Sequence, residues 1–413
     1  MNMTQFEGYK YIDGGVCASQ GFQANGLNCG LNPDKEKNDL GMVYSKEPCQ
    51  TAAVYTQNKV KGAPILVTKK HLEAGNGVTH AVLVNSKNAN TGNANGEQVA
   101  AETSRLAADA LGIKENQVVV ASTGVIGLPM PTAPFADHMK QLVDGLSESG
   151  NDAAATAIMT TDTKPKEIAL SFSAGDRKVT IGGMCKGAGM IAPKMKVPHA
   201  TMLCYITTDC AISNELLGSM LGEVVDDSFN KVIVDGDMST NDTVIVMANG
   251  ASGVEIRDNS PDALHFKVAL TMVAQHLARA IAMDGEGATK FVSVEVTGAA
   301  NAAEAEMCAR TVANSLLCKT AWFGCDPNWG RVLAAAGRSG ANFSPENVSL
   351  DYDEMPVVRN GMDAGTAEEE LAKLMKRGEF SVKLDLGEGH GAFTVWTSDV
   401  SYEYVKINAD YHT

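Results

Sequence analysis

The chain has 413 residues, 44% hydrophobic and 20% charged, which is enough apolar content for a well-buried core. A net charge of −15 without a basic cluster disfavours nucleic acid as a partner. No stretch approaches the run of about 20 apolar residues that a membrane helix needs, and the amino terminus lacks signal-peptide features. We therefore expect no membrane association and a cytoplasmic location.

The nine cysteines and eight histidines show no metal-ligand spacing. The cysteines are scattered, odd in number and never spaced as CxxC, and there is no HExxH. The chain also lacks GxGxxG and GxxxxGK[ST], although CKGAG and DGEGATK superficially look like phosphate loops. The sequence predicts reduced, mostly buried thiols, no metal and no cofactor.

Helix-like and strand-like patterns alternate along the chain, and forty glycines fit many tight turns. This predicts a mixed α/β fold of layered sheets with flanking helices. The expected elements, in chain order, are a helix at 97–111, a buried strand at 117–123, a strand buried on both faces at 201–208, a helix at 268–283, a strand at 292–296 and a helix at 364–377. No repeat or linker divides the chain, so we expect one interwoven body.

The segment KGAGMIAPKMKVPHATMLCYITTD, residues 186–209, sets a loop with glycines and prolines directly before Thr201 and a strand-like run. A threonine hydroxyl is a poor nucleophile, but an N-terminal threonine carries its own general base, the α-amine. That amine has a pKa of about 7.7 to 8.0, whereas lysine has one of about 10.4. The pattern is compatible with a chain that cuts itself before Thr201, although taken alone it is more typical of a β-branched residue that begins a strand.

Eight ordered blocks make the chain similar to a known family. They are TAAVYTQNKVKGAP at 51–64, VNSKNANTGNANG at 84–96, ASTGVIG at 121–127, IMTTDTKPK at 158–166, VDGDMSTNDT at 234–243, DGEGATK at 284–290, KTAWFGCDPNWGR at 319–331 and YVKINADYHT at 404–413. Along nearly its whole length the chain resembles the ornithine acetyltransferase family, the glutamate N-acetyltransferases of the cyclic arginine pathway. The resemblance implies transfer of an acetyl group from N2-acetyl-L-ornithine to L-glutamate. Some members also use acetyl-CoA as donor, which the sequence leaves open.

The resemblance also implies a catalytic set. It places self-cleavage between Ala200 and Thr201 and makes Thr201 the nucleophile of a fold like that of N-terminal-nucleophile enzymes. The residues that match the family's oxyanion hole are Thr123 and Gly124. Without the other blocks, ASTGVIG would be read as a strand end followed by a turn.

Cleavage would divide the chain into an alpha chain of residues 1–200 and a beta chain of residues 201–413, and the family implies a heterotetramer with two copies of each. One departure is clear. The common family form reads Pro-Asn-Met-Ala-Thr before the cut, whereas this chain reads PKMKVPHAT at 193–201, which is four residues longer. Because such reactions need a near-attack geometry, we expect slower self-cleavage here.

By resemblance, substrate contacts besides Thr201 fall on Thr160, Lys186, Glu286, Asn408 and Thr413. A lysine or a hydroxyl suits the α-carboxylate that ornithine and glutamate share, and a carboxylate suits an ammonium group. The alternative for Lys186 and Glu286 is a solvated surface charge.

Two other functions remain open at this point. A self-processing amidase or aminopeptidase of similar architecture would give the acyl group to water. A noncatalytic binding or scaffold protein would keep only the fold. The predicted substrate contacts favour acetyl transfer over hydrolysis. The presence of Thr123, Gly124 and Thr201 together disfavours the noncatalytic protein.

Overall fold

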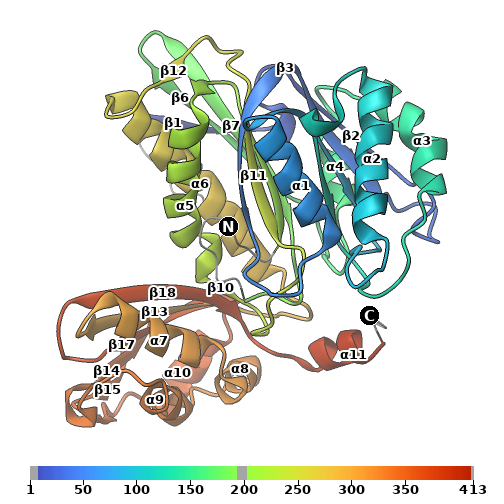
Figure 1. The fold of residues 1–413 in the computed structure, drawn as a ribbon. Helices are drawn as coiled ribbons and strands as arrows, with labels where there is room; N and C mark the ends of the chain where they lie inside the picture. The colour runs from blue at the N-terminus through green and yellow to red at the C-terminus, as the bar shows by residue number, and fades with distance from the viewer. Residues whose placement is uncertain (1–7, 193–201, 411–413) are drawn as a thin grey trace.

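Two large β-sheets organise the structure, a computed structural model that describes residues 8–192 and 202–410 (Figure 1). Helices pack against both sheets, so the predicted mixed α/β class is confirmed. The larger sheet forms the upper lobe of Figure 1 and the smaller sheet the lower lobe. No helix in the described part of the chain combines the length and apolar character needed to cross a bilayer.

The larger sheet has nine strands in the order β1-β6-β7-β8-β11-β3-β4-β5, with β2 paired to β3. Neighbours are antiparallel except β8 with β11 and β4 with β5. Because β8 and β11 lie between β7 and β3, strands from both sides of position 201 build one sheet. The strands are β1 (Tyr9–Ile12), β2 (Phe22–Leu27), β3 (Leu40–Tyr55), β4 (Val78–Asn85), β5 (Val118–Ser122), β6 (Lys166–Ala174), β7 (Arg177–Lys186), β8 (Leu203–Thr208) and β11 (Thr243–Ala248).

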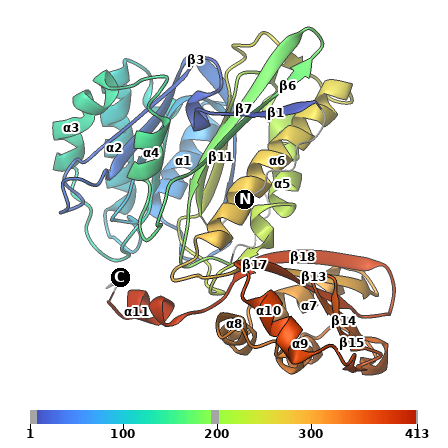
Figure 2. The same cartoon turned by 180° about the vertical axis from the view of Figure 1, so that it is seen from behind.

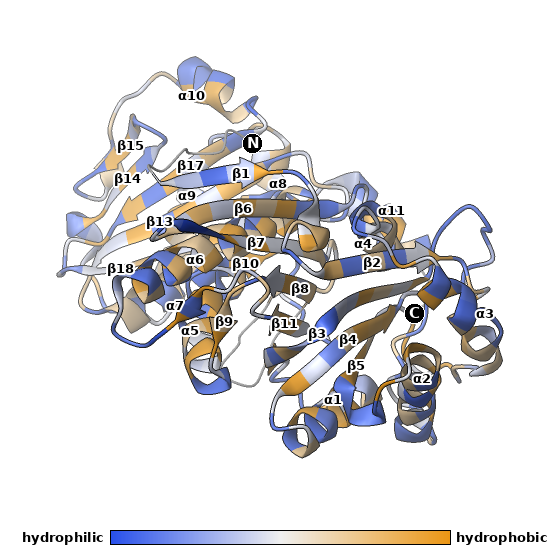
Figure 3. Cartoon of the chain, turned by 90° about the horizontal axis from the view of Figure 1, so that it is seen from above, coloured by the Kyte–Doolittle hydropathy of each residue, from blue (hydrophilic) through white to orange (hydrophobic). Residues whose placement is uncertain are grey.

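In the described part of the chain, six α-helices cover this sheet. The contacts place α5 on β3, α6 on β6 and β7, α1 and α2 on β5, and α4 on β2 and β3, while α3 packs on α2. In Figure 3 the central strands β8 and β11 are predominantly hydrophobic, whereas α2 and α3 carry hydrophilic stretches. The helices are α1 (Ala63–Ala74), α2 (Gly96–Leu111), α3 (Ala133–Asp144), α4 (Asn151–Ala157), α5 (Asn214–Asp226) and α6 (Pro261–Met283).

Strand β8 confirms the prediction of a strand buried on both faces. All six of its residues are buried. Cys204 and Ile206 belong to the hydrophobic cluster that includes α5 and α6, whereas Leu203 and Tyr205 belong to a second cluster. The predicted first residue of this strand, Thr201, lies outside the described residues.

The smaller sheet has seven strands in the order β10-β18-β13-β17-β14-β15-β16, and α7 packs on β13 and β18. Its strands are β10 (Val232–Ile233), β13 (Phe291–Ala299), β14 (Ser349–Tyr352), β15 (Met355–Arg359), β16 (Met362–Asp363), β17 (Glu379–Asp385) and β18 (Gly391–Ser398). The other strands are the pair β9 (Ala211–Ile212) and β12 (Glu255–Ile256), and the other α-helices are α7 (Ala302–Ala313), α8 (Leu316–Phe323), α9 (Trp329–Gly337), α10 (Glu368–Met375) and α11 (Tyr402–Asp410).

Helix α11 lies apart from the rest of the lower lobe. In both Figure 1 and Figure 2 it extends sideways from the seven-stranded sheet and passes beneath the upper lobe. None of its described residues is buried. The helix therefore reaches its place through the chain that precedes it and through a few specific contacts.

The predicted helix at 97–111 corresponds to α2. The predicted helix at 268–283 lies within α6, and the one predicted at 364–377 contains α10. Helix α6 begins earlier than predicted, because Ser260 caps it: the Ala263 N–H donates to Ser260 Oγ at 3.1 Å. All nine cysteines are free thiols, eight of them buried and Cys325 half-buried.

Candidate active site

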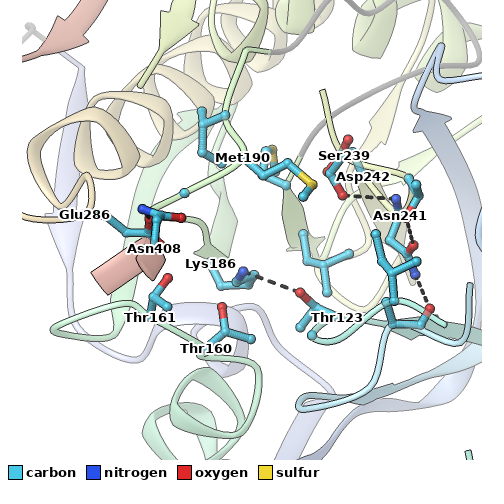
Figure 4. Close-up of a pocket in the computed structure, with 18 residues that line it drawn as sticks. Thr123, Thr160, Thr161, Lys186, Met190, Ser239, Asn241, Asp242, Glu286 and Asn408 are labelled. Atoms are coloured by element: carbon cyan, nitrogen blue, oxygen red, sulfur yellow. Dashed lines mark hydrogen bonds between the residues drawn. The ribbon is translucent and has the colours of Figure 1, made fainter. Parts of the chain in front are cut away.

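A cavity of about 110 Å³ lies where β5 and β7 end and where β8 and β11 begin. Figure 4 shows its lining, to which segments distant in the sequence contribute. Every predicted site residue that the structure describes is found here, namely Thr123, Gly124, Thr160, Lys186, Glu286 and Asn408.

The remaining predicted residues, Ala200, Thr201 and Thr413, lie outside the described residues. Ile191 and Met202, on either side of the segment that holds the expected cleavage point, both line the cavity. Met202 O accepts a hydrogen bond from the Thr243 N–H at 2.6 Å, which ties the start of β8 to β11.

Thr123 and Gly124 form a tight turn directly after β5. The Thr123 N–H donates to Asn85 O at 3.0 Å, and Gly124 adopts a φ of 128°. A Cβ on Gly124 would lie 2.2 Å from the carbonyl carbon of Lys87, so only glycine fits. Among the described residues the Gly124 N–H has no acceptor, which leaves this amide and the Thr123 hydroxyl as the donors that the turn offers to the cavity.

Asn241 also lines the cavity and holds the strand end that precedes this turn, and sequence reasoning did not single it out. Its Nδ2 donates to Ser122 O at 2.9 Å and to Ala89 O at 2.5 Å. Its Oδ1 accepts from the hydroxyls of Thr91 and Thr240, both at 2.6 Å. Because the buried side-chain amide of Asn241 makes all four of these hydrogen bonds, it fixes the end of β5 just before Thr123.

Lys186 is the last residue of β7 and is only 8% exposed. Its Nζ donates to Thr123 Oγ1 at 3.4 Å, the one hydrogen bond of this ammonium to the described residues. Since an ammonium carries three donors, the remaining ones are available to a ligand in the cavity. The surface-charge alternative is therefore wrong for Lys186.

Glu286, in the connection between α6 and β13, is likewise only 8% exposed. Its backbone N–H donates to Ala188 O at 2.9 Å, and its Oε2 accepts from Asn408 Nδ2 at 2.7 Å. A Cβ on Gly189 would lie 2.4 Å from Glu286 Cδ, so the glycine lets the two segments approach. The surface-charge alternative is wrong here too, and Figure 4 shows this pair on the opposite side of Lys186 from Thr123.

Two side chains, those of Asp399 and Ser401, fix the start of the arm, residues 399–410, that carries Asn408. Asp399 Oδ1 accepts from the N–H groups of Thr289 and Lys290 at 2.8 and 2.9 Å. Ser401 Oγ donates to Gly287 O at 2.6 Å, next to Glu286 in the chain. The arm is thereby attached to the same connection that supplies Glu286.

The cavity thus presents a buried ammonium, a buried carboxylate, hydroxyls and amides within a mixed α/β fold. Together these groups form a polar site for a small molecule that carries both charges. Among the described residues no group of three or more His, Cys, Asp or Glu side chains is placed to hold a metal ion.

Comparison with known proteins identifies the family. The ArgJ family model matches residues 23–413, and this chain belongs to that family. It is 48% identical to the arginine biosynthesis bifunctional protein ArgJ of Geobacter sulfurreducens, over 91% of this chain and 95% of that protein. It is 44% identical to the glutamate N-acetyltransferase of Methanocaldococcus jannaschii, over 98% of this chain and all of that protein. The predicted family membership is confirmed.

Two solved structures are also similar. A crystal structure of ArgJ from Bacillus halodurans is 39% identical and covers 50% of this chain and 97% of its own, with a TM-score of 0.48. The ornithine acetyltransferase of Mycobacterium tuberculosis, solved with ornithine, is 34% identical and covers 45% of this chain and 99% of its own, with a TM-score of 0.42.

Proposed function

We propose that this chain is a glutamate N-acetyltransferase of arginine biosynthesis that moves the acetyl group from N2-acetyl-L-ornithine to L-glutamate. The observation that carries the proposal is the family match over residues 23–413, together with relatives of 44 to 48% identity that cover nearly the whole chain. The names of these relatives favour acyl transfer over the amidase or aminopeptidase alternative.

In the proposed mechanism, cleavage between Ala200 and Thr201 frees the α-amine of Thr201. That amine takes the proton of the Thr201 hydroxyl, whose oxygen attacks the acetyl carbonyl of acetylornithine. The C–N bond breaks, the amine of ornithine leaves with a proton, and the acetyl group remains on Thr201 as an ester. The amine of glutamate then attacks the ester, which restores the threonine hydroxyl and predicts ping-pong kinetics.

The Thr123 hydroxyl and the Gly124 N–H are the proposed oxyanion donors. The amide of Thr123 is already donated to Asn85 O, so the side chain of Thr123 acts in its place. Removal of one oxyanion-hole donor typically lowers kcat by about 10²- to 10³-fold.

Lys186 and Glu286 are the proposed charged contacts to substrate. The ammonium of Lys186 has donors free for the α-carboxylate common to ornithine and glutamate, and Thr160 adds a hydroxyl at the same cavity. Glu286, which accepts a hydrogen bond from Asn408, is the proposed partner of an ammonium group of the substrate. Thr413 remains a proposed contact by resemblance.

The processed protein is proposed to be a cytoplasmic heterotetramer of two alpha chains (1–200) and two beta chains (201–413). The mixed sheet, in which β8 and β11 lie between β7 and β3, supports fragments that stay together after cleavage. Use of acetyl-CoA as a second donor remains an open part of the proposal.

The proposal is tested by incubation of the purified protein with acetylornithine, with and without glutamate. Ornithine release that requires glutamate, with acetylglutamate as the second product, is expected. Ornithine release that ignores glutamate would identify a hydrolase, and no release at all would favour the noncatalytic scaffold.

A further inference from the structure

Behind the cavity lies a buried ion network centred on Lys166, the first residue of β6. Its Nζ is 2.6 Å from Asp162 Oδ1 and 2.5 Å from Asp284 Oδ2. The side chains of all three are almost fully buried, at 1%, 0% and 3% exposure. None of the three lines the cavity itself, so the network is not part of the site described above.

Asp162 attaches two parts of the cavity wall to this network. Its Oδ1 accepts from the Gly187 N–H at 2.7 Å, immediately after Lys186, and its Oδ2 accepts from the Thr160 N–H at 3.1 Å. Burial acts to raise the pKa of Asp162, but Lys186 and Lys166 lower it to about 2. The carboxylate is therefore ionised whenever the protein is near neutral pH.

Asp284 attaches a third part. Its carboxylate accepts from the Thr163 N–H at 3.1 Å and from the Thr163 hydroxyl, and it lies two residues before Glu286. The ammonium of Lys166 thus joins the start of β6 to Asp284, 118 positions away. The three segments that meet on Lys166 supply Thr160, Lys186 and Glu286 to the cavity.

We propose that Lys166 is a positioning residue for the reaction: its ammonium neutralises Asp162 and Asp284 and so fixes the relative placement of the Thr160, Lys186 and Glu286 segments. The kinetic effect of this role rests on the proposed function, because it is measured on acetyl transfer. The network by itself is weak support for stability, since a buried ion pair can cost as much in desolvation as it returns. Its value here lies in geometry, because small displacements of binding groups lower the rate of a reaction strongly.

Loss of the ammonium has a specific electrostatic consequence. In Lys166→Met, two buried carboxylates would face each other, and one of them would take up a proton with a raised pKa. The other ionisable groups that face them are Lys186 and the thiol of Cys185, whose pKa burial raises to about 12, so the thiol stays neutral. Asp284→Asn in the same chain would remove one of the two like charges while Asp162 keeps Lys186 as a nearby cation.

The experiment compares the wild type, Lys166→Met, the double variant Lys166→Met with Asp284→Asn, and Lys267→Met as a control. Lys267 lies on α6, the helix that leads to Asp284, and pairs at the surface with Glu223 of α5. The KM for acetylornithine and kcat are measured between about pH 6 and pH 9, across which a shifted carboxyl group would titrate. Hydrogen exchange of the Thr160, Thr163 and Gly187 amides is measured on the same proteins.

We expect Lys166→Met to raise KM about tenfold at the alkaline end and less at the acid end, where the pair holds a proton. The double variant should lie closer to the wild type with a flatter pH profile, and the control should be unchanged. Amide exchange should rise in Lys166→Met alone. An unchanged KM in Lys166→Met overturns the proposal. So does a rise in its KM that neither depends on pH nor is relieved by Asp284→Asn. A wild type without transfer activity would contradict the proposed function, while amide exchange would still test Lys166.

Discussion

The side-chain amide of Asn408 donates both to Glu286 Oε2 at 2.7 Å and to Tyr404 O at 3.0 Å. The first bond crosses 122 positions of the chain and attaches α11 to the cavity, and the second keeps the amide on its own helix. Because α11 has no buried residue of its own, this contact helps to hold its carboxyl-terminal end at the site.

Asn408→Asp replaces the donor by a second carboxylate beside Glu286. When both carboxyl groups are ionised they repel each other and the helix moves away from Glu286, whereas at lower pH one of them takes up a proton and can donate to the other as the Asn408 amide does. We expect the KM for acetylornithine to rise about tenfold or more, with partial recovery at lower pH. Steady-state kinetics across pH measures this effect, with Asn408→Ala as the control that removes the bond without adding charge. Equal behaviour of the two variants would contradict an electrostatic role for this contact.

Thr123→Val keeps the shape of the side chain and removes its hydroxyl. If this hydroxyl is an oxyanion donor, kcat should fall by about 10²-fold or more while KM changes little. Thr161→Val is the matched control, since Thr161 also lines the cavity but lies away from the turn after β5. Similar kcat values for the two variants would remove Thr123 from the proposed mechanism.

The elements with strong periodicity were predictable from the sequence. Helix α2 has apolar residues on one face, and β8 is a short run of apolar and β-branched residues, so local patterns suffice for both. The start of α6 could not be predicted in this way, because its first turn depends on a cap at Ser260 and not on the spacing of apolar residues.

The candidate site was predictable only through resemblance, residue by residue. Asp162, Lys166 and Asp284 lie within two of the family-like blocks, but an isolated Lys or Asp in a sequence is usually a surface charge. The role of Lys166 depends on its contact with Asp284, 118 positions away, and the role of Asn241 depends on its contact with Ser122, 119 positions away. Such pairings depend on the strand order, which local patterns do not contain.

Thr201→Ala tests the processing step. The hydroxyl of Thr201 is the proposed attacking group on the carbonyl of Ala200, and alanine has no such group. Denaturing mass spectrometry should find two species that meet at Ala200 and Thr201 in the wild type and a single uncut chain in the variant. Full transfer activity in an uncut wild type, or in the variant, would contradict the mechanism.

The buried Lys319 should make the free energy of unfolding depend on pH. Its side chain is buried at 1% exposure, and its Nζ donates to Thr397 Oγ1 at 2.6 Å and to Ser398 O, next to Asp399 at the start of the arm. Burial lowers the pKa of Lys319 from 10.5 to about 7, although Asp235 and Asp399 act to raise it.

A lowered pKa makes the unfolded chain bind a proton that the folded chain lacks between pH 7 and 10.5. Within this window the free energy of unfolding rises with pH, by at most about 1.4 kcal/mol per pH unit from this group. Below the window both states are protonated and the cost of burying the ammonium is present in full. Lys319→Met removes this dependence, so the melting temperature of the wild type should increase relative to that of the variant from about pH 7 to pH 9. Lys267→Met, which changes a surface lysine, should instead follow the wild type at every pH. Parallel curves for the wild type and Lys319→Met would show that Lys319 does not titrate in this range.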